Sequence, residues 1–238
     1  GGPGLSNNYL KEHLSKIDAE KFIFIDLFGS PESDTKKPSL NDIYLQIQQA
    51  YEKEDNSSCG ILTHSFGNFL ILEMINNNMI SPLCLLMLNP IPLKFEKWQA
   101  SLSKISSKVT EEDLKKINDL SSNGLFTELF SVLVKYYTHN SNVLDFVIPF
   151  DGTACDFVSN QVYEFDHSMV PNEIKFPVIR IEGESDSFYT DKKLLSKSTY
   201  VINNVGHFPF IENYDAFLEV FKKSENNLCR EIKLKRKD

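Results

Sequence analysis

Six consecutive apolar residues at positions 83–88, Leu-Cys-Leu-Leu-Met-Leu, constrain the fold of this 238-residue chain more than any other feature. A run of this length fits one β-strand. Its lack of polar alternation is typical of a strand buried on both faces. Such strands belong to parallel sheets, which carry helices on both sides. The run therefore predicts a strand inside a mainly parallel sheet.

Other β-rich runs alternate with helical patterns along much of the chain. The expected strands are 22–26, 60–63, 83–89, 178–182 and 200–202. The expected helices are 41–54, 67–77, 191–196 and 214–223, with Asn41 and Asn213 as N-caps of the first and the last. This alternation predicts the α/β class, with a mainly parallel sheet and helices on both faces.

The alternation stops between Pro90 and Pro177, an interval too long for an ordinary crossover. Thr110 followed by Asp113 resembles a capping box that opens a helix at 111–120, and apolar spacing predicts another helix at 126–138. We therefore expect residues 1–90 and 177–238 to form the core. Residues 91–176 should form an inserted helical cap that roofs the site.

Composition excludes several function classes. The 25 basic and 33 acidic residues leave a formal charge of −8, which disfavours nucleic acid as a partner, and the basic residues at 233–237 are typical of a solvated tail. No apolar stretch reaches the roughly 18 residues of a membrane helix. The four cysteines show no metal-binding spacing. We expect a cytoplasmic protein without membrane partner, metal or cofactor; the oligomeric state stays open.

Residues 60–70 carry the first chemical signal, an apolar strand that runs through His64-Ser65-Phe66-Gly67 into a helix. A serine on such a tight turn projects its hydroxyl out of the sheet, and the next amide, that of Phe66, points to where an oxyanion would form. The turn needs small residues two positions before and after the serine. Gly67 meets this need and Thr63 departs from it, so an ordinary strand-turn-helix junction is the alternative.

Two further residues complete a catalytic set with Ser65. A serine hydroxyl needs an imidazole base, and the imidazole needs a carboxylate to orient it. Asp186 follows the expected strand 178–182, and His207 follows the strand 200–202. The order serine, acid, histidine, each past a strand end, predicts Ser65, Asp186 and His207 as the catalytic residues, with Glu184 as the alternative acid. A structural role is expected for His64, and three histidines lack a partner pattern: His13, His139 and His167.

The chain opens with Gly1-Gly2-Pro3-Gly4. A glycine-rich loop lets backbone amides approach a substrate oxygen, as the second donor of an oxyanion hole must. The alternative is a plain turn.

Together these segments resemble the α/β-hydrolase superfamily and, within it, the proline iminopeptidase branch. The family motifs H-G-G-P-G, D-x-R-G-x-G-x-S, G-x-S-x-G, G-x-x-D and G-H correspond to residues 1–4, 26–33, 63–67, 183–186 and 206–207. Phe28, Pro31 and Thr63 depart from the motifs, standing where the family has arginine, glycine and glycine.

The resemblance implies oxyanion amides from Gly2 and Phe66, no cofactor, and acidic cap residues that bind a substrate amine. The pool of such acids is Glu128, Asp145, Asp151, Asp156 and Glu164, each of which could instead be a surface acid. The superfamily also places a central strand just before the glycine loop. We therefore expect residues outside these 238 to complete the sheet between 22–26 and 60–63.

The expected function is hydrolysis of an ester or amide bond in a small molecule or short peptide through an acyl-enzyme. An aminopeptidase of the proline iminopeptidase type fits the resemblance. A carboxylesterase or thioesterase with the same triad is the first alternative. A catalytically silent protein of this fold that binds a ligand is the second.

Overall fold

The computed structural model describes residues 1–18, 21–35, 37–54, 59–93, 95–139, 147–163, 174–188 and 198–235. Within them, one sheet of four parallel strands has the order β1-β2-β3-β4. The strands are β1 Ile61–His64, β2 Leu85–Leu88, β3 Val178–Gly183 and β4 Ser198–Ile202. Four of the five predicted strands are thus confirmed, with ends shifted by at most two residues.

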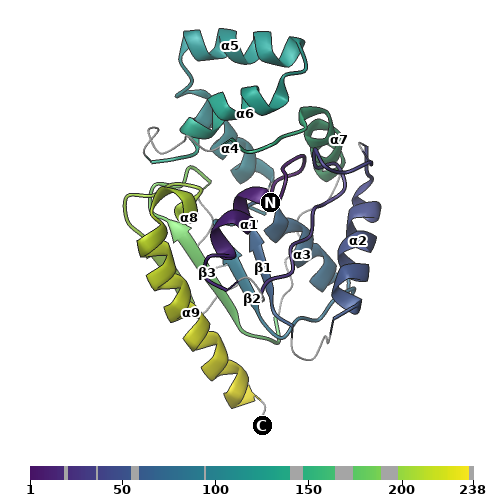
Figure 1. The fold of residues 1–238 in the computed structure, drawn as a ribbon, viewed down its shortest axis with the longest axis vertical. Coiled ribbons are helices and arrows are strands. Elements are labelled where there is room, and N and C mark those ends of the chain that lie inside the picture. Colours follow the sequence, from purple (N-terminus) through teal and green to yellow (C-terminus); the bar gives the residue numbers. More distant parts are fainter. Residues whose placement is uncertain are drawn as a thin grey trace.

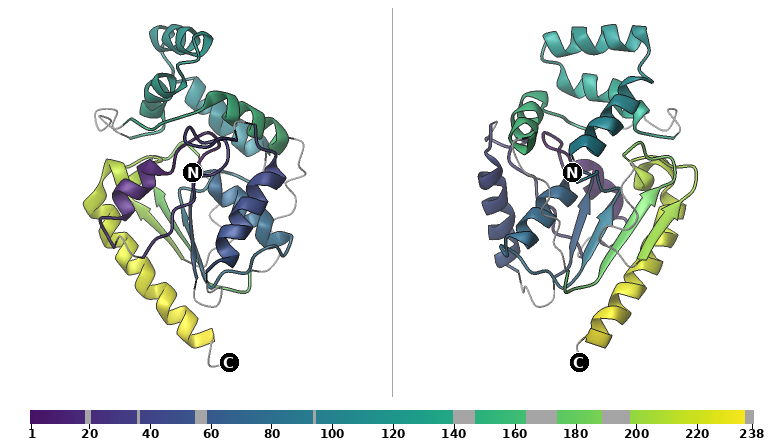
Figure 2. Two further views of the ribbon diagram at one scale, coloured as in Figure 1. Left: turned by 45° about the vertical axis from the view of Figure 1, so that its right-hand side comes forward. Right: turned by 180° about the vertical axis from the view of Figure 1, so that it is seen from behind.

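The helices cover both faces of this sheet (Figure 1 and Figure 2). Their bounds are α1 Asn8–Leu14, α2 Leu40–Glu52, α3 Gly67–Asn76, α4 Phe95–Ser106, α5 Glu111–Ser122, α6 Phe126–Leu133, α7 Gly152–Tyr163, α8 Pro209–Glu212 and α9 Tyr214–Lys235, with a 3₁₀ turn η1 at Val134–Tyr136. Helices α2 and α3 lie against one face. Helices α1, α8 and α9 lie against the other.

The position of β2 between two layers of helices explains why its sequence is apolar without interruption. Leu85 and Met87 belong to the core that α2 and α3 cover, and Leu86 and Leu88 belong to the core that α1 and α9 cover. Because successive side chains of a strand point to opposite faces, a strand between two layers of helices needs apolar residues at every position.

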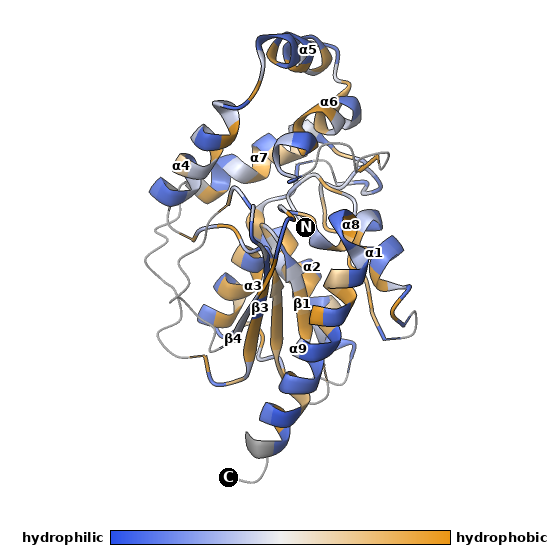
Figure 3. Cartoon of the chain, turned by 90° about the vertical axis from the view of Figure 1, so that its left-hand side faces the viewer, coloured by the Kyte–Doolittle hydropathy of each residue, from blue (hydrophilic) through white to orange (hydrophobic). Residues whose placement is uncertain are grey.

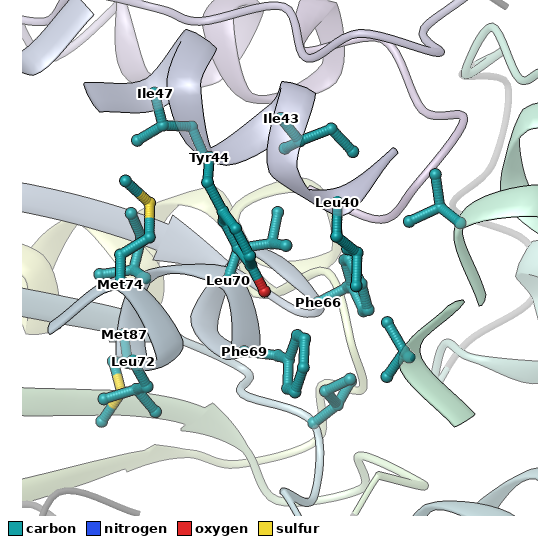
Figure 4. Packing of buried hydrophobic residues seen from close by; sticks show 14 of the residues in the cluster. Leu40, Ile43, Tyr44, Ile47, Phe66, Phe69, Leu70, Leu72, Met74 and Met87 are labelled. Atoms are coloured by element: carbon teal, nitrogen blue, oxygen red, sulfur yellow. The ribbon is translucent and has the colours of Figure 1, made fainter. Parts of the chain in front are cut away.

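Packing between α2 and α3 holds the turn that carries Ser65. Figure 4 shows Phe66 and Phe69 beside Leu40 and Tyr44 of α2. The rings of Phe66 and Phe69 stack with centroids 5.4 Å apart. The start of α3 is therefore fixed by the core, which a catalytic turn requires.

Capping explains where several helices begin. Ser39 caps α2 and forms a reciprocal capping box with Asp42, so the prediction of Asn41 as the cap is wrong: Asn41 lies inside the helix, where its side chain cannot cap. The Thr110 hydroxyl accepts from the Asp113 amide at the start of α5, and the Asn213 side chain accepts from an amide in the first turn of α9, both as predicted. The predicted helix 191–196 lies outside the described residues.

The segment between β2 and β3 contains α4, α5, α6, η1 and α7. In Figure 1 these helices lie above the carboxyl ends of the strands, with α5 farthest from the sheet. Figure 3 shows mixed polar and apolar colouring on them, whereas much of the sheet beneath them is coloured apolar. The separation of residues 91–176 as a cap domain stays a prediction.

The predicted strand at 22–26 is wrong. These residues form no ladder with a strand of the described chain, and Ile23 is 65% exposed. Phe22 and Phe24 are apolar because they pack on the core beside α9, where the rings of Phe22 and Phe221 lie 6.2 Å apart. A strand forms only against a neighbour, and within the described residues β1 pairs with β2 alone. Completion of the sheet by residues outside the chain stays a prediction.

No helix of the described part combines the length and the apolar character that crossing a bilayer requires.

Candidate active site

The carboxyl ends of the four parallel strands meet at one edge of the sheet, and each is followed by a residue of the candidate site. Ser65 follows β1, Asn89 follows β2, Asp186 lies three residues past β3, and His207 lies five residues past β4. A parallel sheet gathers such residues without regard to their distance along the chain, which is why sites form at this edge.

Ser65 sits in a strained turn. Its φ of 55° is in the left-handed region, which costs a residue other than glycine roughly 1 kcal/mol. The Ser65 amide donates to the Leu88 carbonyl at 3.0 Å, and its carbonyl accepts from the Asn68 amide at 3.1 Å. These bonds hold the strained backbone, so the hydroxyl is presented beyond the strand end.

Thr63 is accommodated in this turn although glycine is usual there. A Cβ built on Gly67 would lie 3.8 Å from the Thr63 Cβ, an ordinary van der Waals contact, and 3.3 Å from the Gly1 nitrogen. The buried Thr63 hydroxyl donates to Asn68 Oδ1 at 2.5 Å. The departure from the motif therefore adds a hydrogen bond beneath the serine rather than a clash.

The side chains of Ser65, His207 and Asp186 form one hydrogen-bonded series. Ser65 Oγ lies 2.8 Å from His207 Nε2, and His207 Nδ1 lies 2.9 Å from Asp186 Oδ2. With Asp186 as the acceptor, Nδ1 carries a proton, and in the neutral imidazole Nε2 then accepts from the serine hydroxyl. Both the histidine and the aspartate side chains are nearly buried, with 4% and 7% of their surfaces exposed.

Asp186 is fixed by two further donors. Asn89 Nδ2 donates to Oδ2 at 2.7 Å, and the Phe188 amide donates to Oδ1 at 2.9 Å. Asn89 is fully buried, and its Nδ2 also donates to the Gly206 carbonyl at 3.0 Å. The alternative acid, Glu184, is exposed and accepts instead from the Asn204 amide at 3.3 Å.

His64 lies beneath the site and supports the loop of His207. Its Nε2 donates to the His207 carbonyl at 2.9 Å, and its Nδ1 accepts from the Tyr9 hydroxyl at 2.9 Å. Complete burial, followed by repulsion from His207, holds the pKa of His64 well below 6.5, so the ring is neutral. Burial also raises the pKa of Tyr9 above its ordinary value, which keeps its hydroxyl a donor.

Aromatic rings surround the histidine. Phe188 lies 4.9 Å from the His207 ring and stacks on Tyr137, with centroids 5.5 Å apart and planes 8° from parallel. Burial raises the pKa of Tyr137 to about 12. The Phe208 ring also packs edge-on against His207, with ring centroids 5.3 Å apart. The imidazole thus has few orientations open to it.

The glycine loop at the start of the chain lies beside the serine turn. Its backbone is tied to the segment before α7, because the Ser6 amide donates to Pro149 and the Asp151 amide donates to Gly4 at 2.8 Å. Phe66 directly precedes α3, where helix amides have no partner inside the helix. The roles of the Gly2 and Phe66 amides as oxyanion donors stay predictions.

The acidic pool of the cap gives no clear amine site in the described residues. Glu128 and Asp156 are exposed, and Asp151 Oδ1 accepts from the Ala154 amide at the start of α7. Asp145 and Glu164 lie outside the described residues, as does His167.

Sequence reasoning missed several residues that the site uses. Asn89, Tyr137 and Glu212 contact the loops of Asp186 or His207, and none belongs to a motif considered above. His139, which lacked a partner pattern, has Nδ1 2.8 Å from Ser185 Oγ. Asn89 alone had a usable signal, because it directly follows the most apolar strand.

Comparison with known proteins shows likeness in structure but not in sequence. No family model matches the chain, and no curated protein matches it. The solved structures that it resembles include a proline iminopeptidase from Mycobacterium smegmatis, at 16% identity over 98% of this chain and 88% of that one, with a TM-score of 0.59. An esterase from Exiguobacterium antarcticum is 13% identical over 94% and 89%, with a TM-score of 0.63.

MenH from S. aureus is 18% identical over 93% of this chain and 90% of that one, with a TM-score of 0.61. At these identities the likeness concerns the fold. Together with the parallel sheet and its flanking helices, it shows that this chain has the α/β-hydrolase fold.

Proposed function

We propose that this protein is a serine hydrolase that cleaves an ester or amide bond through an acyl-enzyme, with Ser65 as nucleophile, His207 as general base and Asp186 as the orienting acid. The observation that carries the proposal is the series Ser65 Oγ–His207 Nε2–His207 Nδ1–Asp186 Oδ2, with separations of 2.8 and 2.9 Å. These are the distances at which a histidine can take the proton of a serine hydroxyl.

The proposed reaction has two halves. In the first, Ser65 Oγ attacks the carbonyl carbon while His207 Nε2 takes its proton, and the imidazolium then protonates the leaving alcohol or amine. In the second, water attacks the acyl-enzyme, His207 takes a proton from the water, and Ser65 recovers its hydroxyl as the acid departs. Asp186 accepts from Nδ1 throughout and stabilises the imidazolium.

The oxyanion formed in both halves would accept hydrogen bonds from the Phe66 and Gly2 amides. Phe66 lies at the start of α3, where the aligned peptide dipoles favour negative charge. A Cβ on Gly67 would lie 3.3 Å from the Gly1 nitrogen, so the glycine loop lies next to the turn of Ser65. This closeness supports Gly2 as the second oxyanion donor.

An ester substrate is favoured over an amino-terminal proline. A proline aminopeptidase must bind a substrate ammonium with carboxylates near the nucleophile. Among the described members of the acidic pool, Glu128 and Asp156 are exposed and Asp151 caps a helix; Asp145 and Glu164 lie outside the described residues. The rings of Tyr137 and Phe188 lie beside His207 and add apolar surface next to the proposed base.

A substrate panel tests the proposal. Wild type, Ser65→Ala and a control, Ser122→Ala, would be treated with a fluorophosphonate probe, short- and long-chain p-nitrophenyl esters, and proline anilide. Ser122 is an exposed serine of α5 that donates to a carbonyl of its own helix, so it controls for general serine reactivity. We expect labelling and ester cleavage by wild type and Ser122→Ala but not by Ser65→Ala, with a loss on the order of 10⁶ in kcat as in a comparable serine enzyme.

Each outcome separates the candidate functions. Cleavage of proline anilide would favour the aminopeptidase over the esterase. A folded wild-type protein that neither reacts with the probe nor cleaves any substrate would contradict the proposal and support the silent binding protein.

A further inference from the structure

Glu212, the last residue of α8, uses its carboxylate in a way that the proposed reaction does not require. Oε2 accepts from the Gly206 amide at 2.8 Å and from the His139 amide at 2.7 Å. Oε1 accepts from the Phe208 amide at 3.0 Å. One carboxylate therefore binds the residues on both sides of His207, together with a residue from the segment that follows η1.

The remaining amide of this loop is also bound. The His207 amide donates to the Tyr137 carbonyl at 2.9 Å. Three consecutive amides thus have acceptors outside the loop. The amides of Gly206 and Phe208 donate to the Glu212 carboxylate, and the amide of His207 donates to the Tyr137 carbonyl. Hydrogen bonds to a charged acceptor are roughly twice as strong as neutral ones, so the loop is held most firmly where Glu212 binds it.

The loop is also packed closely against its neighbours. A Cβ on Gly206 would lie 2.5 Å from the Tyr137 carbonyl oxygen and 2.9 Å from the His139 nitrogen. A Cβ on Gly183 would lie 2.0 Å from the Gly206 oxygen. The loop after β3, the loop after β4 and the segment 137–139 therefore stack backbone on backbone. Glycine is required because no side chain fits between them.

From this arrangement we infer that Glu212 is a positioning residue: its carboxylate fixes the His207 loop from both sides and fastens it to residues 137–139, so that Nε2 stays within reach of Ser65. The inference rests on the proposed function, because it concerns the position of the His207 imidazole relative to Ser65. Misplacement of a catalytic group by about 1 Å can cost on the order of 100-fold in rate.

Glu212→Gln tests the inference because glutamine has nearly the shape of glutamate. Its side-chain oxygen can still accept a hydrogen bond, but its side-chain nitrogen cannot. Glu212→Ala removes all three bonds, and Glu184→Gln is the matched control. Glu184 is also a glutamate that accepts a backbone amide from the loop after β4, but its donor is Asn204, outside the 206–208 stretch. We expect kcat on a p-nitrophenyl ester to fall on the order of 10-fold in Glu212→Gln, with KM within about twofold, and unchanged kinetics in Glu184→Gln.

Two readouts distinguish positioning from stability. Thermal melting gives the folded fraction, and the downfield proton NMR signal of His207 Nδ1–H reports its bond to Asp186 without any substrate. The inference predicts that this signal weakens or disappears in a folded Glu212→Gln, and that kcat falls by more than the folded fraction. If Glu212→Ala does not fold, Glu212→Gln decides.

A Glu212→Gln protein with the NMR signal and kcat of Glu184→Gln would overturn the inference. A wild type that turns over no ester would instead refute the proposed function. In that case the NMR signal alone still tests whether Glu212 fixes the His207 side chain.

Discussion

His64 should make the stability of the protein fall in mild acid. The ring is completely buried, and burial together with His207 holds its pKa well below 6.5. In the unfolded chain a histidine titrates at about 6.5. Above that pH neither state is protonated, so the stabilising effect of a neutral His64 is fully present. As the pH falls below 6.5, the unfolded state binds a proton that the folded state does not bind, and the free energy of unfolding decreases.

The size of the effect follows from proton binding to the unfolded state alone. At pH 5.5, one unit below the unfolded pKa, a group that stays neutral in the folded state lowers the free energy of unfolding by about 1.4 kcal/mol relative to pH 7.5. The loss grows by about the same amount per further pH unit until the folded pKa is reached. This is a sizeable part of the 5–15 kcal/mol that is typical of a domain.

Urea unfolding of wild type and His64→Gln at pH 7.5 and 5.5 measures this contribution. Glutamine can donate to the His207 carbonyl and accept from the Tyr9 hydroxyl, but it does not titrate. Other titrating groups contribute to both proteins and cancel in the difference. We expect wild type to lose about 1.4 kcal/mol more than the variant between the two pH values. Equal losses in the two proteins would refute the assignment of His64 as a buried, neutral histidine.

Two further predictions concern the loops. Asn89→Ala, which removes the buried donor to Asp186, should lower kcat on the order of 10-fold with little change in KM, as measured by steady-state kinetics on an ester. An unchanged kcat would contradict a role for this contact. Gly206→Ala should unfold the protein at ordinary temperature, because its Cβ would lie 2.5 Å from the Tyr137 oxygen. Gly124 is the control, because its φ is 68° but no atom lies within 4 Å of a built Cβ. In a melting experiment, Gly124→Ala should lower the free energy of unfolding by only about 1–2 kcal/mol.

The order of the elements, and the meeting of Ser65, Asp186 and His207 at one edge of the sheet, could be predicted because each depends on local pattern. The run at 83–88 needs two covered faces, and loops that follow parallel strands must meet at one edge. Thr110 and Asn213 likewise act within one turn of the helix they cap. These features depend on residues close together in the sequence, so a single chain reveals them.

Other features depend on partners far along the chain, and the sequence does not reveal them. Residues 22–26 have the composition of a strand, but the state of a strand depends on its neighbour, and these residues pack by their side chains instead. In the sequence Glu212 resembles any surface glutamate, because its partner His139 lies 73 positions away and only the fold brings the two together. The Asn41 error is smaller: Ser39 and Asn41 are both good caps, and the reciprocal bond with Asp42 decides for Ser39.

The acyl-enzyme itself is the most direct test of the central claim. Wild type, Ser65→Ala and His207→Ala would be mixed with a p-nitrophenyl ester, quenched in acid within the first turnover, digested and analysed by mass spectrometry. The account predicts an acyl adduct on Ser65 in wild type, none in Ser65→Ala, and slow or undetectable formation in His207→Ala. An adduct on another residue, or ester turnover by Ser65→Ala at the wild-type rate, would contradict it.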